Sequence, residues 1–190
     1  MDKLKLRYQA DSFFTTYINL CAMNAEAKDL TFVIPMVVNG AFTAELSLKA
    51  ILTENGIEYS NVHSLLYLFL LLPDDFALEV INRSMERAPA FRDFQVWENQ
   101  LFLISDAFEE WRYSYEAKHS LILDTNFLQA FIQALNSTLT AHYGSVKAEP
   151  VDTMEEDEEI EKKFQNATES QKQAAIEHFD RIVKKGRNQK

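Results

Sequence analysis

The stretch that decides the fold reads FQVWENQLFLISDAFEEWRYSYE and spans residues 94–116. Large apolar residues recur in it at alternating spacings of three and four, forming a heptad seam: Phe94, Trp97, Leu101, Ile104, Phe108, Trp111 and Tyr115. Such a seam is typical of a helix that packs at a shallow angle against other helices. We therefore predict one long helix over these residues, packed within a helical bundle.

Helix signals flank this stretch on both sides. Apolar periodicity and capping residues predict helices over about 4–28 and 31–55, a short one from Ser60 or Asn61 to Pro73, and two more over 74–88 and 124–143. Only 4 Gly and 4 Pro occur in 190 residues, which argues against a β-rich fold with many turns. The expected fold is an all-α, antiparallel bundle of four to six helices over residues 1–144.

The composition changes after Gly144. Residues 145–154 are typical of a linker, and an acidic run over 155–161 precedes a polar stretch with few large apolar residues. Two interpretations remain open for this segment: a solvated helix, or a helix that folds on a partner. We expect residues 145–190 to form an acidic linker and a helical tail outside the bundle.

Charge and motifs exclude several classes of protein. The net charge of −10 argues against a broad nucleic-acid-coating surface, because phosphate binding depends on Lys and Arg, but it leaves room for a small basic cleft. Cys21 is the single cysteine, so an internal disulfide and a multi-cysteine zinc site are excluded. Zinc-hydrolase, P-loop, kinase and dinucleotide-binding motifs do not occur. We expect no metal and no cofactor.

The apolar segments predict a protein of the cytoplasm. The first eight residues are charged and lack the apolar stretch of a signal peptide. The most apolar run, residues 62–72, is far shorter than the roughly 20 residues that span a bilayer. We expect a cytoplasmic protein that does not associate with a membrane.

An acidic residue interrupts the apolar stripe of the second helix. Glu45 follows Val37 and Ala41 and precedes Leu48, at a position where helical periodicity predicts a core residue. A buried carboxylate is unfavourable unless a cation reaches it. Lys49 lies one turn further on, and His63 and Arg112 are the long-range candidates. Two interpretations of Glu45 remain open: it forms a structural ion pair that holds the bundle in register, or it has a functional role.

A second constellation lies at the end of the predicted long helix. Arg112 and His119 are seven residues apart, so on a continuous helix they share one flank, about 10 Å apart along the axis. Arginine suits bidentate phosphate binding, and histidine transfers protons near neutral pH. Together they are the minimum set of groups for metal-free RNA cleavage. The alternative is that His119 only caps the C-terminus of that helix.

Three segments of the sequence resemble the HEPN superfamily (higher eukaryote and prokaryote nucleotide-binding domains). AFTAELSLKAIL at 41–52 carries an acid and a lysine one turn apart, and HSLLYLF at 63–69 follows a short loop that contains Gly56. FEEWRYSYE at 108–116 is similar to the aromatic-Arg-Tyr-x-Tyr-Glu segment of several HEPN-like families. The resemblance covers residues 42–119 and does not extend to the tail.

The resemblance implies a homodimer in which two Arg-x(4–6)-His motifs meet across a cleft. Active members are metal-independent ribonucleases, often toxins or phage-defence effectors. Mapped onto this chain, the catalytic pair is Arg112 and His119, and the binding or supporting residues are Glu45, Lys49, His63, Tyr115 and Glu116. On this mapping we expect Glu45 to face Arg112.

Tyr113 departs from the family pattern, which usually has Asn, Asp or His after the arginine. Many members of the superfamily have lost catalysis and serve as modules that bind a protein or a nucleotide. The alternative function is therefore a non-catalytic dimeric interaction module. Residues 154–190 are then the candidate contact for an antitoxin or another protein.

Overall fold

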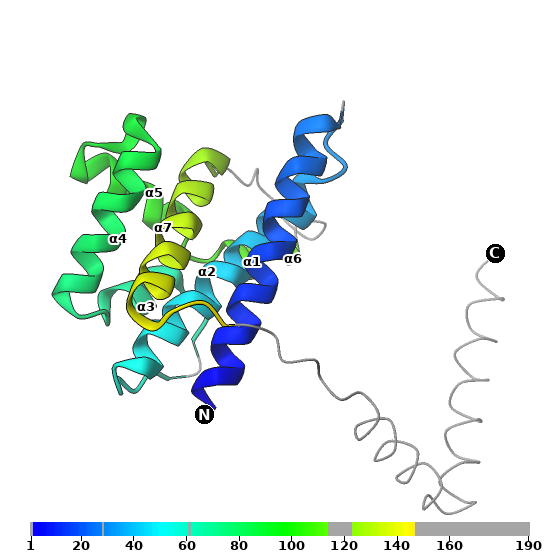
Figure 1. Ribbon diagram of the computed structural model, residues 1–190. Coiled ribbons are helices and arrows are strands. Elements are labelled where there is room, and N and C mark those ends of the chain that lie inside the picture. Colours follow the sequence, from blue (N-terminus) through cyan, green and yellow to red (C-terminus); the bar gives the residue numbers. More distant parts are fainter. Residues whose placement is uncertain (1, 28, 61, 114–122, 147–190) are drawn as a thin grey trace, which may run out of the picture. The chain divides into compact units, whose positions relative to one another are not determined.

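The computed structural model describes residues 2–27, 29–60, 62–113 and 123–146, and within these ranges every regular element is a helix (Figure 1). The predicted all-α fold is confirmed. The elements are α1 (Lys3–Glu26), α2 (Val33–Glu54), α3 (Leu65–Leu70), α4 (Asp74–Arg87), the 3-10 turn η1 (Pro89–Phe91), α5 (Phe94–Ile104), α6 (Ala107–Arg112) and α7 (Thr125–Tyr143). Of the tail predicted over residues 145–190, only residues 145 and 146 are among the described residues.

α2 is the central helix of this bundle. It packs against α1, α3, α6 and α7, and α7 in turn lies between α4 and the α1–α2 pair (Figure 1). Small residues let the neighbours of α2 approach closely: a Cβ added at Gly40 would lie 2.7 Å from Tyr17 Cε2 and 3.1 Å from Ile132 Cδ1. Since α2 is surrounded on several sides, even some of its polar residues are buried, namely Thr43, Glu45 and Ser47.

Capping residues set the ends of the helices much as the sequence predicted. The Asp124 side chain accepts hydrogen bonds from two backbone N–H groups in the first turn of α7, and Asp93 does the same once for α5. Gly56 and Gly144 follow α2 and α7 with φ of +70° and +74°, a conformation that disfavours residues with a Cβ.

The prediction of one long helix over residues 94–116 is wrong in one respect: a turn at Ser105 and Asp106 interrupts the helix. The seam still points inward on both sides of the break, because Trp97, Leu101 and Ile104 are buried and Phe108 and Trp111 are partly buried. Phe94, the first residue of the seam, is 56% exposed. The break is one reason why the described residues hold seven α-helices rather than four to six.

The break has a physical cause in the start of α3. In a continuous helix the Ser105 carbonyl would bond the N–H of residue 109. Here it accepts the Leu65 N–H at 2.9 Å, and Ser105 Oγ accepts the Leu66 N–H at 3.2 Å and bonds Ser64 Oγ at 2.7 Å. α3 therefore begins at Leu65, not at the predicted residues 60–61, because Ser105 satisfies its first N–H groups.

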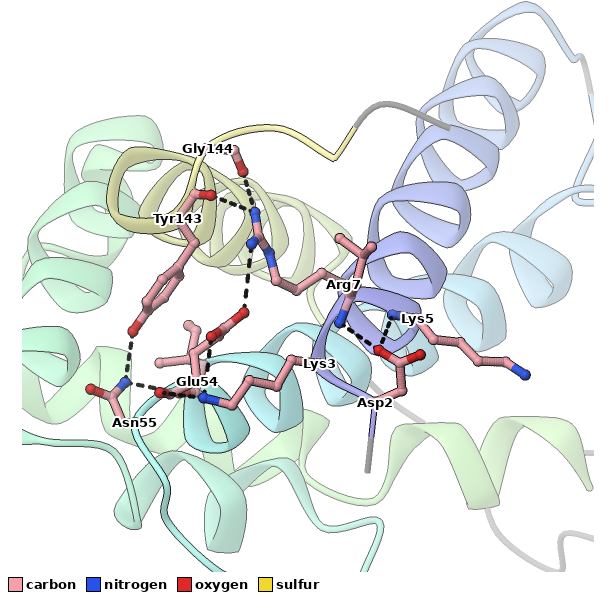
Figure 2. A network of polar contacts seen from close by, with 10 residues as sticks. Asp2, Lys3, Lys5, Arg7, Glu54, Asn55, Tyr143 and Gly144 are labelled. Atoms are coloured by element: carbon pink, nitrogen blue, oxygen red, sulfur yellow. Dashed lines mark hydrogen bonds and ion pairs between the residues drawn. The ribbon is translucent and has the colours of Figure 1, made fainter. Parts of the chain in front are cut away.

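A polar network joins the start of α1 to the ends of α2 and α7 (Figure 2). One guanidinium nitrogen of Arg7 donates to the Tyr143 carbonyl at 2.7 Å and the Gly144 carbonyl at 2.6 Å, and another lies 3.5 Å from Glu54 Oε1. Asn55 Nδ2 donates to Tyr143 Oη at 2.8 Å. The last carbonyls of α7, which have no partner within their own helix, are thus satisfied by a cation from α1.

Replacing Arg7 with alanine is expected to lower the free energy of unfolding by about 2 kcal/mol, because two charge-assisted hydrogen bonds to backbone carbonyls are lost. Chemical denaturation monitored by circular dichroism measures this. Lys5→Ala is the matched control, since it removes the same charge from an exposed position of the same helix. An equal loss in both variants would mean that net charge, and not the network, accounts for the effect.

Candidate functional site

The carboxylate of Glu45 is buried in the centre of the bundle and has two partners. The residue is 1% exposed. Lys49 Nζ donates to Oε1 at 2.7 Å, and His63 Nδ1 lies 3.0 Å from Oε1 and 3.1 Å from Oε2. The sequence had predicted Lys49 as the local partner, and His63 was one of its two long-range candidates. The structure therefore brings together three of the supporting residues, from α2 and from the loop that precedes α3.

Lys49 is held on both sides of its ammonium group. Besides the bond to Glu45, Nζ lies 5.8 Å from the centroid of the Tyr59 ring. The Tyr59 hydroxyl in turn bonds Thr53 Oγ1 at 3.1 Å. The Lys49 side chain is 12% exposed, so its charge is directed into the protein and toward Glu45.

Aromatic rings connect this ionic group to α6. The Phe108 ring stacks on Phe42 with centroids 4.9 Å apart, and the His63 ring lies 5.9 Å from Phe108. Phe13 from α1 meets Phe42 edge to face at 4.7 Å. Phe108 thus links His63 to the aromatic rings of α1 and α2. The heptad seam had marked Phe108 as a core residue only, and its contact with His63 was not foreseen.

Arg112, the last residue of α6, lies over the same aromatic surface. Its guanidinium carbon is 4.8 Å from the centroid of Phe108 and 4.6 Å from that of Tyr113, and the residue is exposed. The expectation that Glu45 faces Arg112 is wrong: the ion pairs of Glu45 are with Lys49 and His63, and no described carboxylate pairs with Arg112. The guanidinium stacks instead on two rings of its own segment, those of Phe108 one turn earlier and of the adjacent Tyr113.

Three predicted site residues lie outside the described residues. They are Tyr115, Glu116 and His119, which fall in the range 114–122. The pairing of Arg112 with His119 therefore stays a prediction from the sequence.

A second polar cluster joins α4 to α7. Glu79 accepts from Arg83 Nε at 2.7 Å and lies 2.7 Å from His142 Nε2, and Thr138 Oγ1 donates to it at 3.3 Å. His142 continues the apolar stripe of α7, a position at which helical periodicity predicts a packed side chain. The His142 side chain is instead 38% exposed, and its ring contacts Phe76 at 4.5 Å. The spacing of four between Glu79 and Arg83 was the one available signal for this cluster.

Acid is expected to weaken the cluster around Glu79. Burial raises the pKa of the Glu79 carboxyl, but hydrogen bonds from His142 and Arg83 outweigh it, and the net pKa lies below its ordinary value. A lowered folded-state pKa stabilises the fold above the ordinary carboxyl pKa, and the contribution is lost as the pH falls through the lowered value.

Glu79→Gln is therefore expected to destabilise the protein by about 1 kcal/mol at neutral pH and by progressively less in acid. Denaturation midpoints measured from pH 7 to about pH 3 test this. Glu86→Gln, at an exposed position of the same helix, is the control and should show no such convergence. A constant difference between Glu79→Gln and the unsubstituted protein at all pH values would contradict the prediction.

No family model, curated protein or solved structure matches this chain. Among the described helices, none combines the length and the apolar character needed to cross a membrane.

Proposed function

We propose that this chain is a HEPN-like protein that acts on RNA, with Arg112 as the residue that binds the phosphate. One observation carries the proposal: Arg112 is exposed, and no described carboxylate pairs with it. Its guanidinium stacks on the rings of Phe108 and Tyr113. If Glu45 had neutralised this arginine, a role in binding phosphate would have been weakened. Glu45 instead bonds Lys49 and His63, so the positive charge of Arg112 is available to an anion.

The proposed reaction is cleavage of a phosphodiester without a metal ion. Arg112 stabilises the negative charge that grows on the phosphoryl oxygens, and His119 acts as base or acid in the proton transfers. As the resemblance implies, two copies of the motif meet in a homodimer. The biological role would be that of a toxin or a phage-defence effector in the cytoplasm.

The surface chemistry suits a short RNA segment. A chain with a net charge of −10 does not coat nucleic acid broadly, so contacts must come from a local patch. Here a cation and a histidine contact one phenylalanine ring, Phe108, and form such a local patch. We therefore expect contacts with only a few nucleotides of the substrate.

The test is an RNA cleavage assay with the purified full chain in the presence of EDTA. Arg112→Ala and His119→Ala are each expected to lower the cleavage rate by about 10²–10⁴-fold. Arg92→Ala, which removes an exposed arginine that precedes α5, serves as the control and should leave the rate unchanged. Undiminished cleavage by the double variant Arg112→Ala/His119→Ala would refute this assignment of the site.

A second candidate function is a non-catalytic interaction module, and the outer face of α5 favours it. Phe102 is 68% exposed and Leu103 is 46% exposed, which is unusual for large apolar side chains next to each other on one helix. If this face forms the dimer, Phe102→Ser/Leu103→Ser should yield monomers by light scattering. If residues 154–190 bind the partner protein, their deletion should abolish that complex and leave the bundle folded.

A further inference from the structure

His63 presents its two ring nitrogens to different surroundings. Nδ1 lies 3.0 and 3.1 Å from the two oxygens of Glu45, so this nitrogen carries the proton and donates it to the carboxylate. In a neutral imidazole the other nitrogen, Nε2, is then a bare acceptor. No described residue bonds Nε2, and the His63 side chain is 39% exposed. A carboxylate that fixes one tautomer in this way is how proteins prepare a histidine for proton transfer.

His63 and the arginine proposed to bind phosphate share one aromatic neighbour. The His63 ring and the Arg112 guanidinium both contact the ring of Phe108, at 5.9 Å and 4.8 Å from its centroid. Phe108 is itself fixed by its stacking on Phe42. One rigid aromatic support thus carries both a proton-accepting nitrogen and a cation.

The ionic balance of Glu45 does not require a charged His63. Lys49 already supplies a cation to Glu45 Oε1 at 2.7 Å, and this ammonium group is largely enclosed. The carboxylate therefore stays paired when His63 is neutral, and the histidine is free to change its charge during a reaction. A histidine needed purely for neutralisation would not have a lysine bonded to the same oxygen.

We infer that His63 is a catalytic residue of this site, that it removes the proton from the attacking 2′-hydroxyl group of RNA, and that Glu45 is its positioning residue. The inference rests on the proposed function, since the phosphate is the one that Arg112 binds. It assigns the role of base to His63.

The step is balanced without any further reactant. Nε2 of His63 takes the 2′-hydroxyl proton, and the 2′-oxygen forms a bond to phosphorus. The bond from phosphorus to the 5′-oxygen breaks, and that oxygen leaves with a proton from water, to which His63 afterwards returns the proton that it accepted. Arg112 balances the charge on the non-bridging oxygens. The products are a 2′,3′-cyclic phosphate and a 5′-hydroxyl end, and a 2′-deoxy substrate has no nucleophile.

The decisive variant is His63→Asn, tested in the full chain with a single-stranded RNA oligonucleotide. The asparagine amide nitrogen takes the place of Nδ1 and still donates to Glu45, but nothing replaces Nε2. We expect an unchanged melting temperature, a kcat lower by about 10²–10⁴-fold, and a KM within about twofold of the unsubstituted value. Glu45→Gln should also lower kcat more than it changes KM.

The chain offers a matched control in His142→Asn. His142 is also a half-exposed histidine bonded to a carboxylate, that of Glu79, but it lies on the α4–α7 side of the bundle. This substitution should leave kcat unchanged. As a second readout, free imidazole should restore part of the cleavage to His63→Ala, because the side chain it replaces is accessible to solvent.

The possible outcomes separate the inference from the function on which it rests. Full cleavage by His63→Asn, with cleavage abolished in Arg112→Ala, overturns the role of His63 and leaves the proposed function standing. Cleavage of an all-2′-deoxy oligonucleotide overturns the 2′-hydroxyl step. An unsubstituted protein that cleaves no RNA overturns both the function and the inference. If His63→Asn unfolds, failure of imidazole to rescue a folded His63→Ala overturns the role of His63.

Discussion

Replacing Lys49 with methionine is expected to lower the free energy of unfolding by about 3 kcal/mol, because a buried carboxylate is left without its nearest cation. Glu45 is 1% exposed and cannot regain water without opening the bundle. Its remaining hydrogen-bond partner would be His63. Urea denaturation at neutral pH measures the loss.

The control for this prediction removes both charges. In Glu45→Met/Lys49→Met no buried carboxylate remains, so stability should return to within about 1 kcal/mol of the unsubstituted protein. Lys5→Met, at an exposed position of α1, should have little effect. A double variant as unstable as Lys49→Met would show that the ion pair itself, rather than the isolated carboxylate, accounts for the loss.

Replacing Gly40 with valine is expected to destabilise the fold by about 3 kcal/mol, because there is no room for a side chain where three helices meet. A Cβ at this position would lie 2.7 Å from Tyr17 Cε2 and 3.1 Å from Ile132 Cδ1. Tyr17 is itself buried, so its ring cannot move away into solvent. Thermal denaturation measures the effect.

A double-mutant cycle tests the proposed clash at Gly40. Tyr17→Leu removes the ring that a side chain at position 40 would meet. The loss in Gly40→Val/Tyr17→Leu should then be smaller than the sum of the two single losses. Strict additivity would mean that the clash with Tyr17 is not the cause.

The sequence predicted the helices well because their signals are local. The stripe of α7, its Asp124 cap and the glycine after it are all determined within a few residues, and all are confirmed. The burial of Glu45 could also be predicted, since an acid within an apolar stripe points inward with its neighbours. That Lys49 bonds it follows from a spacing of four residues on one helix.

Contacts between distant segments could not be predicted in the same way. The heptad seam predicts a continuous helix through residue 105. No local sequence signal indicates that the Ser105 carbonyl accepts a hydrogen bond from the Leu65 N–H rather than from the next turn of its own helix. Arg7 was likewise overlooked, because its carbonyl partners at residues 143 and 144 are brought near only by the fold.

By itself, then, the sequence determined the helical class, most helix ends and the presence of a charged group in the core. The tertiary structure alone decided which distant residue bonds the Glu45 carboxylate. His63 does so, whereas the exposed Arg112 lies on Phe108. The reason is physical. Periodicity states which face of a helix is buried, but the distant partner of a buried charge depends on how other segments pack. The loop before α3 brings His63 to Glu45, while Arg112 at the end of α6 stacks on Phe108 and Tyr113 of its own segment.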